Sequence, residues 1–575
     1  MRHLSRLSIL FLACLFLTMP FSGISQDVEQ TIKADPWKST GAVTMSHILT
    51  WPKDSLKNDL PYSYYLSGSL NTTFFGVVSM PVSFSYTNNK FASTIAYPFN
   101  RFSIAPSYRW IKTYIGFASM TFSPYTLAGR EFMGGGVELT PPDFPLSFSA
   151  YYGRFNKAVE FDSTLMQPIY RRMSGGMMLG YKSEKFNVSA NVVRSNDVEK
   201  SLSLNKSDSN YLAPKGNVAF GVNADVHLFE NTTLSAQYAM SIVDNNCSSD
   251  STDSAILENT DDTHRYQAYK VSASQSVSFG SIGVSYEQVS PNYTSFAAYH
   301  NTDDFRNLTV DFATRIGSKI NLSGNVGYQR DNLDNQDVNT NTQAIYNVSL
   351  QVTPIERLSL NGSVSNIQSY VYIKDVVEKV SETNQYQNLD TLSYTELNFS
   401  ANGAASYSFG DQQALSQTVS ASYSYQKASH VQKYTDDFTG TNIHNLNASY
   451  QISHNASKTS LSLSANFNHT DAGEQKSDVY TYSATLSNSY VKNLRASVSA
   501  NYNTVDAETD YTIINTRASL NYSFLQHHTV DLNFSALTNN SKSSGTQYSL
   551  NLTYTYNFGC GLKRTDGKCH WYGDF

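Results

Sequence analysis

The sequence has little charge, few cysteines and, after its first twenty residues, no long apolar run. Only 15% of its 575 residues are Asp, Glu, Lys or Arg, whereas disordered chains are rich in charge and poor in aromatic residues. The net charge of −6 provides no basic surface for nucleic acid. No later apolar run approaches the roughly 20 residues of a membrane-spanning helix. These shortages argue against a disordered chain, a nucleic-acid-binding protein and a helical membrane protein.

Aromatic residues, in contrast, are abundant. They make up 13% of the chain and are mostly 40 Tyr and 31 Phe, against 4 Trp and 15 Pro. Ala, Leu, Glu and Lys, which dominate helical bundles, do not dominate here. The composition therefore predicts a large all-β protein.

The first 25 residues have the pattern of a secretory signal peptide. Arg2 and Arg6 precede an apolar stretch at residues 7–17, and small residues at 23 and 25 fit a cleavage site after Ser25. An alternative is a lipoprotein anchored at Cys14. Cleavage after Ser25 leaves residues 26–39 as a short periplasmic segment before the first strand.

Strict alternation of apolar and polar residues repeats from residue 186 to the C-terminus. In one segment Leu461, Leu463 and Ala465 alternate with Ser and Asn residues, and the same pattern fills residues 494–502. Because side chains alternate faces along a strand, each such segment has one apolar face and one Ser/Asn/Thr/Gly face.

The length of the segments, their continuity and their terminal aromatic residues favour a transmembrane barrel. The competing interpretation is a series of secreted β-sandwich domains. The segments match the roughly 9 to 11 residues of a tilted transmembrane strand. They continue without a linker, and Tyr or Phe often closes an end, as in the aromatic girdles of outer-membrane barrels. We predict a single closed antiparallel transmembrane β-barrel over residues 40–558, with about 26 strands or alternatively 24.

The connections between these strands alternate in length. Short ones, such as residues 182–185, 453–457 and 525–528, alternate with long polar ones, such as residues 243–264, 291–304 and 372–391. Outer-membrane barrels have short periplasmic turns and longer external loops. The first strand should therefore run outward, at about residues 40–51.

One part of the chain resembles a known group of proteins. The resemblance is carried by Phe99-Asn100-Arg101-Phe102, by Ser119-Met120-Thr121-Phe122-Ser123-Pro124-Tyr125-Thr126-Leu127-Ala128-Gly129, by Gly134-Gly135-Gly136-Val137-Glu138-Leu139 and by Tyr151-Tyr152-Gly153-Arg154-Phe155-Asn156-Lys157-Ala158. These segments are similar to segments of uncharacterised outer-membrane barrel proteins of the Bacteroidetes. The resemblance covers roughly residues 62–159. The resemblance implies the outer membrane of a diderm bacterium and no particular activity.

Charged residues gather in the early part of the predicted barrel. Arg109 and Glu138 fall on the polar faces of their strands, and Arg130 and Arg154 lie near strand ends. One interpretation is a charged lumen constriction that orients polar or anionic solutes. The preferred interpretation is an interior ion-pair network that stiffens the wall, or solvated loop charge.

A barrel of this size needs something to close its lumen. Barrels of 16 to 18 strands already leave a water channel, and those of 22 are plugged. Residues 26–39 are too few for a separate plug domain, which argues against a TonB-dependent receptor. The candidates are infolded loops, a terminal segment or another protein. The region with Pro124, Gly134 to Gly136 and Pro141-Pro142 is the favoured source of bulges or an infolded constriction.

The C-terminal tail, residues 559–575, breaks the alternation. Cys560 and Cys569 lie close in sequence, and in an oxidising periplasm we expect them to form a disulfide. A metal site with His570 is the alternative, although its spacing is unusual. Cys247 is then left as a free thiol. The disulfide-linked tail would close the lumen or bind a periplasmic partner.

No motif for an enzyme, a metal or another cofactor is present. The sequence lacks a G-x-S-x-G elbow, a P-loop, H-E-x-x-H and C-x-x-C. We expect an outer-membrane channel or transport component for polar solutes, embedded in lipid. The alternative is a structural, assembly or adhesion barrel that recruits envelope or export proteins. A hydrolase with its site on the barrel wall is a third, less favoured hypothesis.

Overall fold

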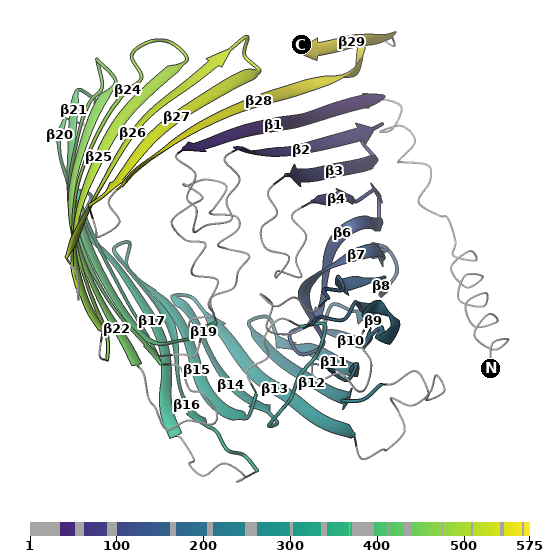
Figure 1. The fold of residues 1–575 in the computed structure, drawn as a ribbon. Helices are drawn as coiled ribbons and strands as arrows, with labels where there is room; N and C mark the ends of the chain where they lie inside the picture. Colours follow the sequence, from purple (N-terminus) through teal and green to yellow (C-terminus); the bar gives the residue numbers. More distant parts are fainter. Residues whose placement is uncertain are drawn as a thin grey trace.

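The computed structural model contains one large antiparallel sheet that closes on itself (Figure 1). It describes residues 35–51, 62–88, 100–160, 168–203, 211–247, 262–298, 303–334, 342–366, 369–370, 396–411, 413–429, 440–473, 475–507, 510–540, 545–565 and 568–574. The predicted signal peptide lies outside these residues. Within the described part of the chain, no helix is long and apolar enough to cross a membrane.

The strands follow one another around the barrel in chain order. They are β1 (Trp37–Trp51), β2 (Tyr62–Phe74), β3 (Val78–Thr87), β4 (Arg101–Ile104), β5 (Ser107–Tyr108), β6 (Ile111–Ser123), β7 (Leu127–Leu139), β8 (Leu146–Asn156), β9 (Arg172–Lys182), β10 (Phe186–Asp197), β11 (Gly216–Phe229), β12 (Thr232–Asp244), β13 (Thr263–Val277), β14 (Gly280–Val289), β15 (Phe305–Ile316), β16 (Ile320–Arg330), β17 (Thr342–Ile355), β18 (Leu358–Asn366), β19 (Ser369–Tyr370), β20 (Glu396–Asp411), β21 (Leu415–Ser429), β22 (Gly440–His454), β23 (Thr459–Ala472), β24 (Gln475–Asn488), β25 (Leu494–Asp506), β26 (Tyr511–Phe524), β27 (His528–Asn539), β28 (Gly545–Thr565) and β29 (Lys568–Asp574). A 3-10 turn, Glu199–Ser201, follows β10.

The predicted closed barrel of 26 strands is confirmed. β4 and β5 are two pieces of one strand between β3 and β6. β18 and β19 likewise both pair with β20. β29 pairs with β28 beyond the wall. Counting each broken strand once and leaving out β29, 26 strands form the wall.

The first and last wall strands close the barrel. β1 pairs antiparallel with β28 along its whole length, from Trp37 opposite Leu562 to Trp51 opposite Tyr548. On the inner side of this seam, hydroxyl groups pair at 3.1 Å between Thr44 and Thr555. An even number of strands makes this last pairing antiparallel.

Glycines on the outer face near the seam are covered by aromatic rings. Gly41 lies opposite Phe558, and Gly68 lies opposite Phe84. A Cβ at Gly41 would lie 2.8 Å from the Phe558 ring, and a Cβ at Gly68 would lie 2.5 Å from the Phe84 ring. The absence of a side chain therefore lets each ring lie flat across its neighbouring strand.

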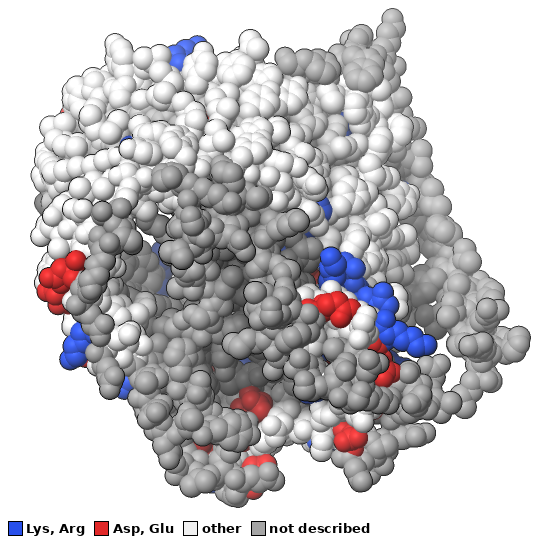
Figure 2. Space-filling view, in the orientation of Figure 1, with Lys and Arg blue, Asp and Glu red and all other residues white. Residues whose placement is uncertain are grey.

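The two faces of the wall separate as the alternation predicts. On β25, Val498 and Tyr502 point outward and are about half exposed, whereas Ser497 and Asn501 point inward. The outer wall at the top of Figure 2 is almost free of charged side chains. The barrel thus has an apolar outer face and, along β25, an inner face rich in hydroxyl and amide groups.

The two ends of the barrel differ in their connections, as expected. β2–β3, β9–β10 and β26–β27 are joined by three residues each at the end where the chain enters β1. We call this the short-turn end and the opposite one the long-loop end. Two connections at the long-loop end are nevertheless short: β23 and β24 are joined by two residues, and β6 and β7 by three. The β6–β7 connection is important below.

The C-terminal tail differs from expectation. β28 continues past residue 558 to Thr565, and β29 returns along it as a hairpin (Figure 1). The register places Cys560 opposite Gly573 and Cys569 opposite Arg564. Arg564 lies four residues along β28 from Cys560, so Cys569 is roughly 13 Å from Cys560 along the strand. This distance is too large for a disulfide. The predicted Cys560 to Cys569 disulfide is therefore wrong for this structure, in which Cys560 is a free thiol.

Candidate functional site: the inner layer of the lumen

Two segments from the long-loop end fold back into the barrel and pack on its inner wall. One is the tip of the β6–β7 hairpin, residues 123–127, and the other is residues 293–298, between β14 and β15. We call the two together the inner layer. They meet at Ala128, whose backbone N–H donates to the carbonyl of Ala297 at 3.4 Å.

The hairpin tip is held by inward-facing side chains of distant strands. The Thr126 hydroxyl donates to Asn191 Oδ1 on β10 at 2.7 Å. Asn223 Nδ2 on β11 donates to the carbonyl of Phe122 at 3.3 Å. Across the lumen face, the Tyr125 hydroxyl donates to Glu287 Oε1 on β14 at 2.6 Å. The tip has therefore left the line of its own strands and spans the inside of the wall.

The second segment is anchored along its backbone. The Phe296 N–H donates to Asn217 Oδ1 at 3.1 Å, and the Ser241 hydroxyl donates to the carbonyl of Thr294 at 2.5 Å. The Ser295 hydroxyl donates to the carbonyl of Thr126 at 2.5 Å, which ties the segment to the hairpin tip. Buried carbonyls and amides thus find partners although the segment belongs to no strand, as burial requires.

Apolar side chains fill the space between the inner layer and the wall. One cluster consists of Met120, Phe122, Leu127, Phe132, Tyr151, Phe155, Val193 and Ala297. A second consists of Tyr125, Ala239, Ala268, Val289, Tyr293 and Phe305. Phe132 and Tyr293 are 1% exposed, although both lie on the inner side of a barrel. The lumen face is therefore apolar and close-packed on this side.

Two arginines hold Phe296. Arg130 Nη1 donates to the Phe296 carbonyl, and the Arg172 guanidinium lies 4.0 Å from the centre of the Phe296 ring. Arg172 is itself fixed by two hydrogen bonds to Asp197, at 2.7 and 2.9 Å. Bidentate pairs of this kind fix the guanidinium plane, so the ring has a rigid cover.

Buried hydroxyls in the inner layer remain protonated. Burial raises the pKa of the Tyr125 hydroxyl far above its ordinary value, and the neighbouring Glu287 carboxylate raises it further. Burial also raises the pKa of Tyr293. Glu287 pairs in addition with Lys270 Nζ at 3.2 Å. Tyr125 is therefore a permanent hydrogen-bond donor to a charged acceptor, a strong type of contact.

The four residues of the predicted constriction fall in different settings. Arg130 belongs to the inner layer. Glu138 is on the inner face of β7, where it accepts from the Tyr114 hydroxyl at 3.0 Å. Arg109 differs from the prediction, which placed it on the polar face of a strand. It lies in the exposed turn between β5 and β6, with φ of 53°. Arg154 faces outward on β8 and contacts the Met133 sulfur at 3.1 Å, because its alternation places it opposite the exposed Met133.

The region that the sequence predicts to fold into the lumen does so only in part. Pro124 lies in the hairpin tip, whereas Gly134 to Gly136 are wall positions of β7 that pair with strands on both sides. Pro141 and Pro142 lie in the connection to β8 at the short-turn end. Sequence reasoning missed Tyr293 and Phe296, which it placed in a polar external loop. The signal was present: residues 293–298 read Tyr-Thr-Ser-Phe-Ala-Ala, unusually apolar for such a loop.

The opposite wall, β16 to β28, has a polar inner face that no segment covers within the described part of the chain. Directly opposed side chains pair across strands, for example Ser460 with Ser487 and Ser535 with Ser549, each at 2.6 Å. A cavity with a volume of about 490 Å³ lies against β16 to β21. Its inward lining residues include Asn321, Ser349, Asn361, Asn402 and Ser422. Among the described residues, no group of three or more His, Cys, Asp or Glu side chains is placed to hold a metal ion.

Comparisons with known proteins concern the fold. No protein-family model and no curated protein matches the chain. The P pilus usher (PapC) translocation pore aligns over 90% of this chain and 99% of its own, at 11% identity and a TM-score of 0.37. The FrpB iron transporter from Neisseria meningitidis aligns over 93% and 83%, at 11% identity and 0.37. The ferric enterobactin receptor PfeA from Pseudomonas aeruginosa aligns over 91% and 80%, at 10% identity and 0.41.

Proposed function

We propose that this protein is an integral outer-membrane barrel that acts as a channel or transport component for neutral polar solutes. The inner layer narrows the lumen on one side, and the hydroxyl and amide wall lines the remaining path. The observation that carries the proposal is this asymmetry: one inner wall is covered by the chain itself, and the other is left polar.

The outer surface supports membrane embedding. Large apolar side chains stand at alternate positions around the wall and are exposed, such as Met177, Leu179, Val284, Val498 and Leu520. Each would be in unfavourable contact with water in a soluble protein. In a bilayer the same positions contact acyl chains, and the closed sheet leaves the backbone hydrogen-bonded.

The polar wall supports neutral solutes. On the inward positions of β16 to β28, the charged side chains whose placement is described are Arg495, Arg517 and Asp531. Side chains that both donate and accept hydrogen bonds, such as Ser, Thr, Asn and Gln, suit water and uncharged polar molecules.

Conductance in planar bilayers tests the proposal. The purified full-length protein should give stable channels. Replacing residues 293–297 by a Gly/Ser stretch of equal length should raise the conductance about threefold or more, because the lumen widens. The control variant Ser464→Ala, on the polar wall, should conduct as the parent does. A barrel that stays sealed in both variants would contradict the proposal.

One observation favours a second candidate function, a structural or assembly role in the envelope. The β28–β29 hairpin extends beyond the wall at the short-turn end (Figure 1), which the orientation of the barrel would place in the periplasm. A strand edge at such a position can recruit a partner by strand addition. Co-purification of a periplasmic protein that is lost when residues 566–575 are deleted would support this role.

A further inference from the structure

A row of amide side chains crosses the inner face of the polar wall. We call it the amide row. It takes one directly opposed residue from each wall strand from β16 to β25, with β19 counted as part of β18: Asn321, Gln351, Asn361, Ala404, Ser422, Asn447, Asn466, Thr481 and Asn503. These residues point into the lumen, because the residues that alternate with them, such as Leu360 and Leu446, are exposed on the outer face. In register beyond its two ends lie Arg315 on β15 and Ile513 on β26.

The amide row rises from one end of the barrel towards the other. Both β16 and β25 begin at the short-turn end. Asn321 is the second residue of β16, whereas Asn503 is the tenth residue of β25. The strands of a barrel are tilted and staggered, so a line of directly opposed residues winds along the wall. A solute that follows the row therefore moves across the membrane as well as around the lumen.

Several carboxamides of the row are available to a ligand. Asn321 and Gln351 are exposed on the lumen side. Among the described residues, the side chains of Asn321, Gln351 and Asn447 have no hydrogen-bond partner. In the next row towards the short-turn end, hydroxyl groups pair with one another, as between Ser420 and Ser449 at 2.6 Å. The amide row thus has unused hydrogen-bonding groups where its neighbour has fewer.

A cavity lies against the first part of the row. It is the cavity of about 490 Å³ described above, and every row member from β16 to β21 lines it. Asn402, from the next row towards the long-loop end, adds a further carboxamide. Its described lining contains no charged residue. Binding sites for small molecules have volumes of about 300–1,000 Å³, so this cavity can hold a few units of a polar chain.

The chemistry of the row fits a neutral oligosaccharide. A carboxamide donates and accepts hydrogen bonds at neighbouring atoms, so it can bind two adjacent hydroxyl groups of a sugar ring together. Neighbouring strands lie about 4.8 Å apart, a spacing similar to the length of one sugar unit in an extended chain. Repeating amides therefore match a repeating, uncharged and hydroxyl-rich ligand.

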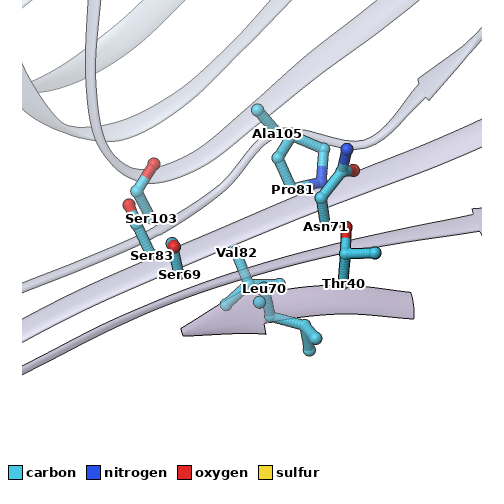
Figure 3. A pocket seen from close by; sticks show the side chains of 10 residues that line it. Thr40, Ser69, Leu70, Asn71, Pro81, Val82, Ser83, Ser103 and Ala105 are labelled. Carbon is cyan, nitrogen blue, oxygen red and sulfur yellow. The ribbon is translucent and has the colours of Figure 1, made fainter. Parts of the chain in front are cut away.

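A second polar cavity, against β1 to β4, does not provide such a row. Its volume is about 370 Å³, and Asn71 is the one carboxamide in its described lining. Figure 3 shows Asn71 beside Pro81, which lies opposite it in the register. The side chain of Pro81 has no hydrogen-bonding atom, and Asn71 Oδ1 already accepts from the Ser79 hydroxyl at 3.2 Å. This cavity therefore serves as the internal control.

We propose that the amide row is the binding path of the barrel for an extended neutral oligosaccharide, whose hydroxyl groups bind successive carboxamides. The cavity against β16 to β21 is the main binding site on this path. The inference rests on the proposed function, for which it names the class of solute. Binding at the row nevertheless does not require that the barrel conducts.

Calorimetric titration of the full-length protein, in a detergent without a sugar headgroup, tests this inference. The probes are cellohexaose, mannohexaose and xylohexaose, with glucose and a polyethylene glycol of similar length as controls. At least one hexasaccharide should bind about tenfold or more tightly than glucose, because several carboxamides act together. Polyethylene glycol should not bind, because its ether oxygens accept but do not donate. Absence of binding by all three hexasaccharides, or equal binding by polyethylene glycol, would overturn the proposal.

The main variant removes two carboxamides that have no partner in the described chain. Gln351→Met/Asn447→Leu keeps the shape of both side chains and should weaken hexasaccharide binding about tenfold or more, since each change removes hydrogen bonds to the ligand. The matched variant Asn71→Leu makes the same kind of change in the second cavity and should bind as the parent does. Unchanged affinity in the double variant, or an equal loss in Asn71→Leu, would contradict the inference.

A gain of affinity provides a test that removes no polar group. Ala404 interrupts the carboxamides of the row inside the cavity and is exposed. Ala404→Asn should therefore tighten hexasaccharide binding about threefold, and an affinity no tighter than that of the parent would count against the row. Conductance of the same protein separates the two hypotheses. A sealed barrel that binds a hexasaccharide contradicts only the channel, and a conducting barrel that binds none contradicts only the amide row.

Discussion

The inner faces of β6 to β15 and of β16 to β28 follow the same alternation but have different chemistry. On β6 to β15 the inward side chains include large apolar groups such as Phe132 and Val193, both almost fully buried. On β16 to β28 they are mostly Ser, Asn and Thr, and partly exposed. The difference is what covers them: the inner layer on one side and, among the residues that the structure describes, no segment of the chain on the other.

Charge follows the same division. Inward charged residues on β6 to β15 include Lys112, Arg130, Glu138, Arg172, Asp197, Asp225, Lys270, Glu287, Asp311 and Arg315. Several are ion-paired or hold the inner layer. Charges buried in a wall are stable only when paired, so they occur where a covering layer supplies partners. The composition of an inner face thus reports what that face contacts.

The largest expected effect comes from removing a side chain beneath the inner layer. Phe132→Ala should lower the free energy of unfolding by about 3–5 kcal/mol, because it leaves a cavity in a close-packed cluster. Denaturant unfolding from lipid vesicles, followed by tryptophan fluorescence, measures this. The matched variant Phe534→Ala, on the outward face of β27, should lose less, since acyl chains can fill the space. Equal losses would erase the distinction between the two regions.

A smaller effect is expected from the ion pair that covers Phe296. Arg172→Ala should cost about 3 kcal/mol, because it leaves Asp197, with a side chain 6% exposed, without its cation. Single-channel recordings should also become noisier as residues 293–298 loosen. The double variant Arg172→Ala/Asp197→Ala should recover part of the stability. A double variant as unstable as Arg172→Ala would mean that the aromatic contact, not the ion pair, dominates.

The smallest effect concerns Cys247, next to β12 at the long-loop end. Burial raises the pKa of its thiol to about 12, and the hydrogen bond to Asp244 at 3.2 Å adds to this. Because the thiolate is the reactive form, alkylation should be slow at pH 8 and rise up to about pH 12. Asp244→Asn should lower the pKa and speed alkylation about tenfold. An unchanged rate would show that burial alone protects the thiol.

The alternation was sufficient to predict the strands, the closed barrel and the positions of the short turns. A pattern such as that of residues 494–502 fixes which side of β25 faces outward, since slipping by one residue would exchange the two faces. The free thiol at Cys247 was also expected and is present. The signal peptide and the Bacteroidetes relationship remain predictions.

The inner layer could be predicted only in part, because it depends on contacts between distant residues. Tyr125 and Glu287 are 162 positions apart, and nothing local to either marks the pairing. Arg154 shows the same limit, since a charge near a strand end was assumed to face the lumen. The tail failed for another reason: a Cys pair close in sequence was taken as close in space, whereas the β28–β29 register separates its members.

The seam between β1 and β28 has a consequence for biogenesis. Thr44 and Thr555, which pair across it, are 511 positions apart. Loop closure over such a distance is slow, and until it occurs the nascent sheet has two unsatisfied borders, each a template for aggregation. The protein should therefore depend on a holding factor in the cell until its last residues emerge, and a chain cut short before β28 should never mature.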